Sequence, residues 1–210
     1  MGVARTVVVL SAAAAAVVLT ACGDNAGPGS AATAAPGADA GAQPAQTGPA
    51  EPANFGPGCG GVPASGPGSF EGMAGEPVAT AASHNPMLSG FSSAIRKANL
   101  VDTLNNAHDI TVFAPANVAF DQLPRATLDR ILADNPALAA RLTYHVVGRT
   151  VAPSELAQGN FESLGGATLS TSGSGQDFKI NGNTSVICGN VHTANATVYI
   201  IDNLLKAPGR

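Results

Sequence analysis

Residues 110–124 combine two patterns of apolar positions. A run of β-branched and aromatic residues over 111–113 predicts a short buried strand, which Pro115 ends. After Pro115 the apolar positions recur at one-turn spacing and predict a short helix. The apolar residues of that helix are Val118, Phe120 and Leu123.

A strand that breaks at a proline and turns directly into a helix makes a corner in the chain. Phe113 and Phe120 stand on either side of this corner, in a sequence with seven Phe and no Trp. We therefore expect both rings to point into the same core. Asn117 opens the predicted helix, where its side chain can cap exposed backbone N–H groups.

The rest of the folded region divides into a helical half and a strand-rich half. Apolar residues at helical spacing predict helices over residues 76–83, 87–97, 100–105, 127–133, 136–144 and 153–157. In the fourth of these helices the residues expected to face the core are Leu128, Ile131 and Leu132. After Gly159 the period changes to two and predicts strands over residues 161–164, 168–172, 177–181, 185–188 and 197–201. This order predicts an α+β fold, in which the strand at 111–113 crosses into the later sheet.

The N-terminus has the pattern of an export signal. Arg5 precedes an apolar run over residues 7–19, which is shorter than the roughly 20 residues that span a membrane. Residues 1–21 are therefore interpreted as a signal peptide. Residues 19–22, L-T-A-C, resemble the lipobox of bacterial lipoproteins, which implies that Cys22 is lipidated and becomes the mature N-terminus. The alternative is an ordinary signal peptide followed by a chance Cys.

Residues 22–57 are interpreted as a linker, and residues 58–210 as the folded domain. The linker is mostly Ala, Gly, Pro, Thr and Gln and has no apolar periodicity. Such a segment cannot bury enough surface to offset the entropy of ordering it, so we expect a disordered tether. Fully extended, the tether would span roughly 100 Å and hold the domain away from the membrane.

The chain has three Cys. If Cys22 carries lipid, Cys59 and Cys188 remain as an even pair in an exported protein, which favours a disulfide bond between them. A zinc site is disfavoured because two distant Cys lack the usual ligand spacing. A redox role is disfavoured because the sequence has no C-x-x-C.

Composition and motifs narrow the chemistry further. The formal net charge is −4, and Lys and Arg are not grouped along the chain, so no nucleic-acid partner is expected. The sequence contains no G-x-S-x-G, H-E-x-x-H or P-loop pattern, and its four His are scattered. We therefore expect no enzyme activity, no metal site and no cofactor.

Three segments resemble the signature boxes of the fasciclin-domain family. They are T-V-F-A-P-x-N-x-A-F-x-x-L-P over residues 111–124, L-T-Y-H-V-V over 142–147 and V-H-T-A-N-A-T-V-Y-I-I-D-N-L-L over 191–205. They occur in family order, within roughly residues 70–208. The resemblance implies a β-wedge with helices packed at one end. The layout is most similar to that of the secreted and lipid-anchored fasciclin antigens of mycobacteria.

The resemblance also selects individual residues. Ala116 departs from the Thr or Ser that is usual in the family, at a cost of about 1 kcal/mol unless Asn117 caps the helix. We expect Asn195 to hydrogen-bond to turn backbone before the last strand, which Asp202 ends. The signature residues are Phe113, Pro115, Asn117, Phe120, Leu123, Asn195 and Asp202.

Two roles are open for the segment Tyr144, His145, Val146 and Val147. His145 lies among apolar neighbours, so it can be a buried ring that a backbone hydrogen bond holds in the core. The resemblance implies the second role, because this motif is implicated in cell adhesion in the family. The four residues are then a candidate partner-binding site. Burial of Tyr144 and His145 favours the first role.

These observations predict an exported, lipid-anchored protein of the cell membrane or cell wall, whose single domain acts in adhesion without catalysis. The expected partner is an extracellular matrix protein, a cell-wall glycan or a host-surface protein, and the protein is expected to be a monomer. Whether it is also shed stays open. The alternative function is an extracytoplasmic carrier or sensor of a small apolar or lipid ligand, bound in a groove between helices and sheet.

Overall fold

A computed structural model describes residues 53–206. The predicted signal peptide, the lipidation site at Cys22 and the linker up to residue 52 lie outside the described residues. Within residues 53–206, no helix has both the length and the apolar character that crossing a membrane requires.

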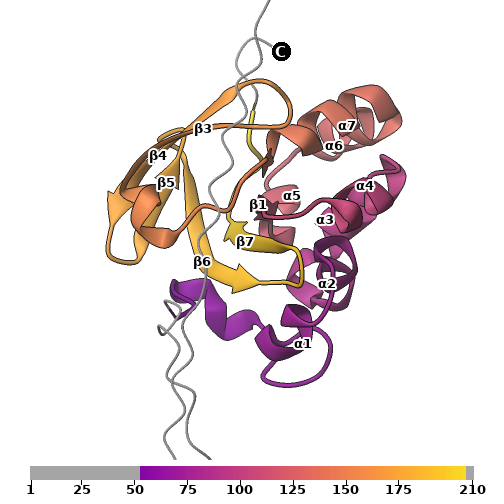
Figure 1. Cartoon of the computed structure of the whole chain (residues 1–210). Coiled ribbons are helices and arrows are strands. Elements are labelled where there is room, and N and C mark those ends of the chain that lie inside the picture. The colour runs from indigo at the N-terminus through magenta and orange to yellow at the C-terminus, as the bar shows by residue number, and fades with distance from the viewer. Residues whose placement is uncertain (1–52, 207–210) are drawn as a thin grey trace, which may run out of the picture. The chain divides into compact units, whose positions relative to one another are not determined.

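Two strands, β1 (Ile110–Pro115) and β7 (Ala196–Ile201), lie side by side in the sheet and run parallel (Figure 1). Phe113 of β1 lies beside Tyr199 of β7. Every residue of both strands is buried, because this part of the sheet is covered on both faces. That double burial explains why both strands appear in the sequence as continuous apolar runs rather than as alternating patterns.

The strands follow the order β2-β1-β7-β6-β5-β4-β3 across the sheet. The two outermost strands also approach each other: Val147 in β2 bridges Ser163, and the N–H of Leu164 donates to the carbonyl oxygen of Val146 at 2.7 Å. The sheet therefore closes almost completely on itself. The remaining strands are β2 (Val146–Val147), β3 (Gln158–Glu162), β4 (Thr168–Ser174), β5 (Asp177–Ile180) and β6 (Thr184–His192).

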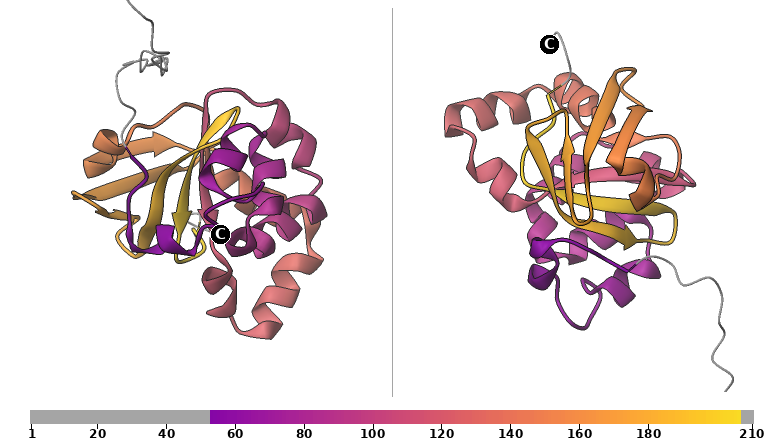
Figure 2. Two further views of the ribbon diagram at one scale, coloured as in Figure 1. Left: turned by 90° about the horizontal axis from the view of Figure 1, so that it is seen from below. Right: turned by 90° about the vertical axis from the view of Figure 1, so that its left-hand side faces the viewer.

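Within the described residues, the α-helices gather on the side of the sheet formed by β1, β6 and β7 (Figures 1 and 2). The α+β wedge with helices at one end is thereby confirmed. Each predicted helix is present within two residues of its expected ends, the last one as a 3-10 turn. The helices are α1 (Phe70–Ala74), α2 (Val78–His84), α3 (Ser89–Lys97), α4 (Val101–Asn106), α5 (Asn117–Asp121), α6 (Arg125–Ala133) and α7 (Asn135–Tyr144), with 3-10 turns η1 (Pro57–Gly61), η2 (Pro86–Leu88) and η3 (Pro153–Ala157).

The sheet separates two apolar clusters. Phe113 belongs to the cluster on the side of β3, β4 and β5, where its ring stacks on that of Tyr199 with the centroids 5.7 Å apart. Phe120 packs instead against the cluster on the helical side. The prediction that both rings share one core is therefore wrong. Successive strand residues face opposite sides of the sheet, and helix α5 lies on the side that Phe113 does not face.

Helices α5 and α6 are less buried than the periodicity predicts. In α5 only Ala119 is buried, and the side chain of Val118 is 44% exposed. In α6 no residue is fully buried; Leu128, Ile131 and Leu132 are each half-buried. Both helices cover the edge of the core rather than entering it, so their apolar residues stay partly in contact with solvent.

The folded domain begins before residue 58, so the predicted linker boundary is too late. Phe55 exchanges two backbone hydrogen bonds with Gly189, of 3.2 and 2.7 Å. Its ring meets that of Phe178 edge to face, with the centroids 5.4 Å apart. An aromatic ring within an otherwise small-residue segment is the sequence signal that this part of the segment packs on the fold.

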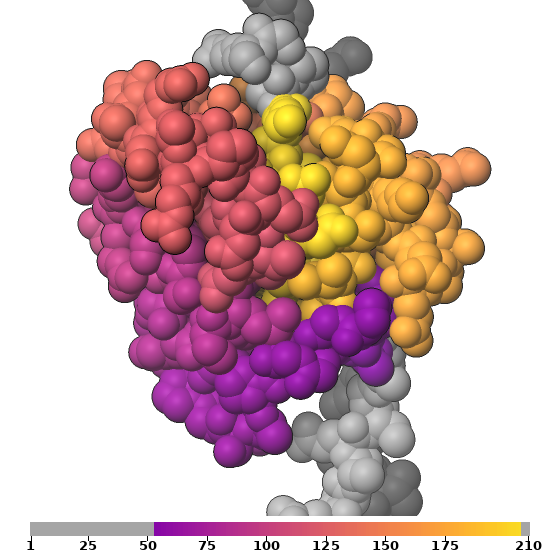
Figure 3. Space-filling view, turned by 180° about the vertical axis from the view of Figure 1, so that it is seen from behind, coloured from indigo at the N-terminus to yellow at the C-terminus, as the bar shows by residue number. Residues whose placement is uncertain are grey.

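The predicted disulfide bond is present and joins Cys59 in η1 to Cys188 in β6. Together with Phe55 it attaches the N-terminal lead-in to strand β6. Figure 3 shows this lead-in, in indigo, lying along the gold strands and continuing toward the helices. The bond therefore connects the first described residues to the sheet.

Replacement of Cys59 and Cys188 by Ala together should lower the free energy of unfolding by up to about 4–5 kcal/mol, because the bond closes a long loop. The two Cys lie 129 positions apart. Urea unfolding of residues 23–210, which contain the whole described fold, measures the difference. Hydrogen exchange at the amides of Phe55 and Gly189 should accelerate as well. Unchanged stability in the double variant would contradict this role.

Candidate functional site

His145 is fully buried, at 0% exposure, between helix α7 and the C-terminal segment. Its Nδ1 donates to the carbonyl oxygen of Arg141 at 2.8 Å, and its Nε2 accepts a hydrogen bond from the N–H of Leu205 at 3.0 Å. These partners require a neutral ring with the proton on Nδ1, because a carbonyl only accepts and a backbone N–H only donates. The imidazole therefore joins the end of α7 to the segment that follows β7.

Burial lowers the pKa of His145 from its ordinary value of 6.5 to about 4. The hydrogen bond to the carbonyl oxygen of Arg141 opposes this shift, whereas the positive charge of the Arg141 side chain adds to it. Protonation would also remove the acceptor that the N–H of Leu205 uses. The ring is thus neutral at pH 7.

The other three residues of the predicted partner-binding segment are buried as well. The Oη of Tyr144 donates to the carbonyl oxygen of Thr168 at 3.3 Å and accepts from the Nδ2 of Asn181 at 2.9 Å. Val146 and Val147 form β2 and are buried. Direct contact with a partner does not fit this burial, because side chains that reach no solvent cannot touch another molecule. The segment acts inside the domain, where it joins α7, β2 and the C-terminal segment.

Asn195 connects the sheet to two helices from its position just before β7. Its Oδ1 accepts from the N–H of Val78 at 2.8 Å, at the start of α2. Its Nδ2 donates to the carbonyl oxygens of Leu104 at 2.8 Å and Ala107 at 2.7 Å, at the end of α4. One amide therefore satisfies backbone groups at both helix ends, which have no partners within their helices.

The sequence suggested that Asn117 caps its own helix, α5. The structure shows that it does not. The N-cap of α5 is Ala116, which provides no side-chain bond. The Oδ1 of Asn117 accepts from the N–H of Gly90 at 3.0 Å and the Oγ of Ser89 at 3.1 Å, while its Nδ2 donates to the carbonyl oxygen of Pro86 at 2.8 Å. Asn117 thus caps the first turn of α3, because that helix starts directly beside α5.

Asp202 follows β7 and joins its end to β6 and to the residue after α5. Its Oδ1 accepts from the N–H of Ser185 at 2.8 Å, and its carbonyl oxygen accepts from the Nε2 of Gln122 at 3.2 Å. Among the other signature residues, Pro115 is the last residue of β1, and Phe120 and Leu123 are half-buried. The polar signature residues therefore bond to backbone groups of neighbouring elements.

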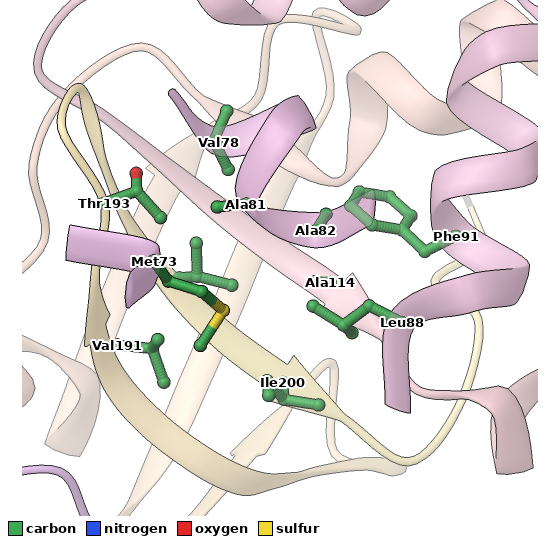
Figure 4. Close-up of a pocket in the computed structure, with 11 residues that line it drawn as sticks. Met73, Val78, Ala81, Ala82, Leu88, Phe91, Ala114, Val191, Thr193 and Ile200 are labelled. Carbon is green, nitrogen blue, oxygen red and sulfur yellow. The ribbon is translucent and has the colours of Figure 1, made fainter. Parts of the chain in front are cut away.

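The space between helices and sheet is nearly filled (Figure 4). Side chains that include Met73 from α1, Phe91 from α3 and Ile200 from β7 line an enclosed apolar cavity there. The cavity offers about 10 Å³ to a water-sized molecule, which is the room for about one water. No lipid chain fits in it, so the predicted carrier groove is absent from this place.

An apolar patch lies open to solvent beside the first signature box. Val118 and Leu164 are the large apolar residues that are more than a third exposed within the described region, and Val118 lies in this patch. Half-buried Met87 and Ile187 flank Val118. The apolar patch consists of Gly61, Pro86, Met87, Ala116, Asn117, Val118 and Ile187.

The apolar patch was not predicted from the sequence, because Val118 was interpreted only as one of the apolar positions at one-turn spacing after Pro115. One signal was available. Residues 186–188 are apolar in succession rather than in alternation, and the strand register shifts between Val186 and Cys188. Such a run places an apolar side chain, here half-buried Ile187, where a strictly alternating strand would place a polar one.

The charged side chains of the described region form no evident reaction centre. No three His, Cys, Asp or Glu side chains within it gather as a metal site. Its ion pairs, His84 with Glu76 and Arg149 with Glu155, involve partly exposed side chains.

The described residues thus form a nearly closed β-wedge, with the polar signature residues bonded to backbone inside it and an apolar patch on its surface. The chain belongs to the fasciclin-domain family, whose sequence profile matches residues 86–208. This family is generally non-enzymatic and includes cell-surface and adhesion proteins.

Relatives support this membership. The chain is 50% identical over 151 residues to the cell surface glycolipoprotein MPB83 of Mycobacterium bovis. This match covers 70% of this chain and 67% of the relative. The chain is 44% identical over 149 residues to the immunogenic protein MPB70 of M. bovis, covering 69% and 76% respectively. It is also 34% identical over 120 residues to human periostin, covering 56% of this chain and 14% of periostin.

Among solved structures, the fold is similar to a FAS1 domain pair from the insect cell adhesion molecule fasciclin I, with a TM-score of 0.53. The sequences are 16% identical, and the match covers 64% of this chain and 52% of the insect chain. At this identity the likeness shows the fold alone, and this chain spans about half of the insect pair.

The lowered pKa of His145 predicts a specific loss of stability in acid. The unfolded ring titrates at about 6.5 and the folded ring at about 4, so the unfolded chain binds the extra proton between these values. The stability is fully present above pH 6.5 and falls as the pH falls toward 4, by about 3 kcal/mol. His145→Gln should flatten this part of the curve of unfolding free energy against pH.

Urea unfolding at several pH values between 4.5 and 7 measures the two slopes. His145→Gln should also be less stable than wild type at pH 7, because an amide does not place its donor and acceptor where the ring places Nδ1 and Nε2. His108→Gln, which changes an exposed ring, serves as the control and should keep the wild-type slope. A wild-type slope in His145→Gln would rule out the buried neutral ring.

Proposed function

We propose that this protein is an exported, lipid-anchored cell-surface protein whose fasciclin domain binds a partner without catalysis. The apolar patch is the observation that carries the proposal. Exposed apolar side chains on a rigid scaffold are typical of protein-binding surfaces. Here the scaffold is held on one side by Asn117 and on the other by the bond between Cys59 and Cys188.

The export pattern and the relatives support the cellular setting. Residues 1–21 have the pattern of a signal peptide, and Cys22 stands where a lipobox requires it. The relatives include a protein named as a cell surface glycolipoprotein, and the solved structure comes from a cell adhesion molecule. In this proposal lipid on Cys22 anchors a monomeric protein, and the residues that follow tether the domain.

The chemistry of the apolar patch favours one kind of partner. It has no charged residue, and its open side chains are Pro86, Met87, Val118 and Ile187. A protein surface with apolar groups of its own complements it better than a charged or strongly hydrated polymer. We therefore place a matrix or host-surface protein ahead of a cell-wall glycan as the partner.

Val118→Glu should weaken binding to a matrix or host-surface protein by about tenfold or more, because it puts a charge at the centre of the apolar patch. The measurement is surface plasmon resonance of residues 23–210 against an array of matrix proteins and cell-wall glycans. Val118 is exposed, so the variant should melt at the wild-type temperature.

Leu164→Glu is the matched control, because it changes the other exposed large apolar residue of the described region, at 51% exposure. It should bind and melt like wild type. Loss of binding in Leu164→Glu with full binding in Val118→Glu would move the contact surface to the β2–β3 side. Saturable binding to none of the proteins or glycans would overturn the adhesion role.

A further inference from the structure

A second surface feature lies away from the apolar patch and shares no residue with it. Helices α6 and α7 and the segment after β7 enclose a groove of about 370 Å³, within the size range of small-ligand sites. Figure 3 shows these salmon helices beside the yellow C-terminal segment. The groove is lined by Leu123, Pro124, Thr127, Arg130, Ile131, Arg141, Leu204 and Lys206.

The charges of this groove all have one sign. Arg130, Arg141 and Lys206 are three of the ten Lys and Arg residues of a chain whose net charge is −4. No Asp or Glu lines the groove, and neither ion pair of the described region involves these three cations. Folding therefore concentrates positive charge that is dispersed along the sequence, and within residues 53–206 no carboxylate pairs with it.

Apolar side chains form the other part of the lining. Leu123, Ile131 and Leu204 are each half-buried and come from three separate segments. Free phosphate or another small hydrated anion would leave this apolar surface unused. A neutral lipid would leave the three cations without a counter-charge. The combination matches a molecule that has an anionic group at one end and a hydrocarbon chain at the other.

Buried His145 holds one wall of the groove. Its hydrogen bond to the N–H of Leu205 fixes the residues on either side, Leu204 and Lys206, which face the groove. Its bond to the carbonyl oxygen of Arg141 fixes the opposite wall at helix α7. The central signature box thus positions residues of the groove through hydrogen bonds of buried His145.

We propose that the groove binds a single anionic amphiphile, such as a fatty acid or a lipid with one phosphate. The carboxylate or phosphate lies among Arg130, Arg141 and Lys206, and the first part of the hydrocarbon chain covers Leu123, Ile131 and Leu204. This site is independent of the proposed adhesion role, because it uses a different surface and a different class of ligand.

The test is isothermal titration of residues 23–210 with dodecyl phosphate below its critical micelle concentration. Saturable binding of one molecule is expected. Arg130→Gln combined with Lys206→Gln should weaken it about tenfold or more, and high salt should weaken it too. Both cations are exposed, so the double variant should melt like wild type. Arg96→Gln combined with Lys97→Gln removes two exposed cations from α3 and should bind like wild type.

Three further ligands separate the alternatives. Inorganic phosphate and dodecyl maltoside each carry half of the required chemistry and should bind at least about tenfold more weakly than dodecyl phosphate. Equal binding of either one would overturn the proposal. So would binding of anionic phosphatidylglycerol vesicles without binding of monomeric dodecyl phosphate, since that would assign the cations to a bilayer surface. Unchanged affinity in the Arg130 and Lys206 double variant would also overturn it.

Discussion

The parallel pairing of β1 with β7 is the constraint on which the rest of the structure depends. These strands belong to the first and third signature boxes, and roughly 80 residues of intervening chain form the crossover that a parallel pair requires. Their side chains supply both apolar clusters at once, Val112 on the helical side and Phe113 on the other. The neighbouring strands β2 and β6 pair directly with these two strands, and the side chains of β1 and β7 contribute to the clusters against which the helices and the other strands pack.

The polar signature residues secure what packs on that pair. Asn195 holds α2 and α4, Asn117 holds α3, Asp202 holds β6, and His145 holds the segment after β7. Each makes at least one bond to backbone, and backbone groups at the ends of elements are the ones that lack local partners. The polar residues of the signature boxes are thus explained by the hydrogen bonds that they make within the domain. The proposed binding takes place on surfaces that these residues hold in place.

Sequence patterns predicted the elements well where one physical signal dominated. The doubly buried strand at Thr111 and the helix ending at Tyr144 followed from apolar runs and periodicity, and the disulfide from the count of Cys. Local periodicity does not indicate on which side of the sheet the helix after Pro115 packs, so Phe120 was assigned to the wrong core. Strand β2 was missed because two residues carry no period. The cationic groove was missed because Arg130, Arg141 and Lys206 meet only after folding.

We infer that the Tyr-His segment, residues 142–147, has a structural role inside the domain. Its neutral His145 ring donates one hydrogen bond and accepts another. The most direct measurement is a long-range ¹H–¹⁵N spectrum of the imidazole in residues 23–210 between pH 7.5 and 4.5. We predict a proton on Nδ1, a bare Nε2 and no protonation until the pH nears about 4. A ring that titrates near its ordinary value of 6.5, or that carries its proton on Nε2, would contradict the account.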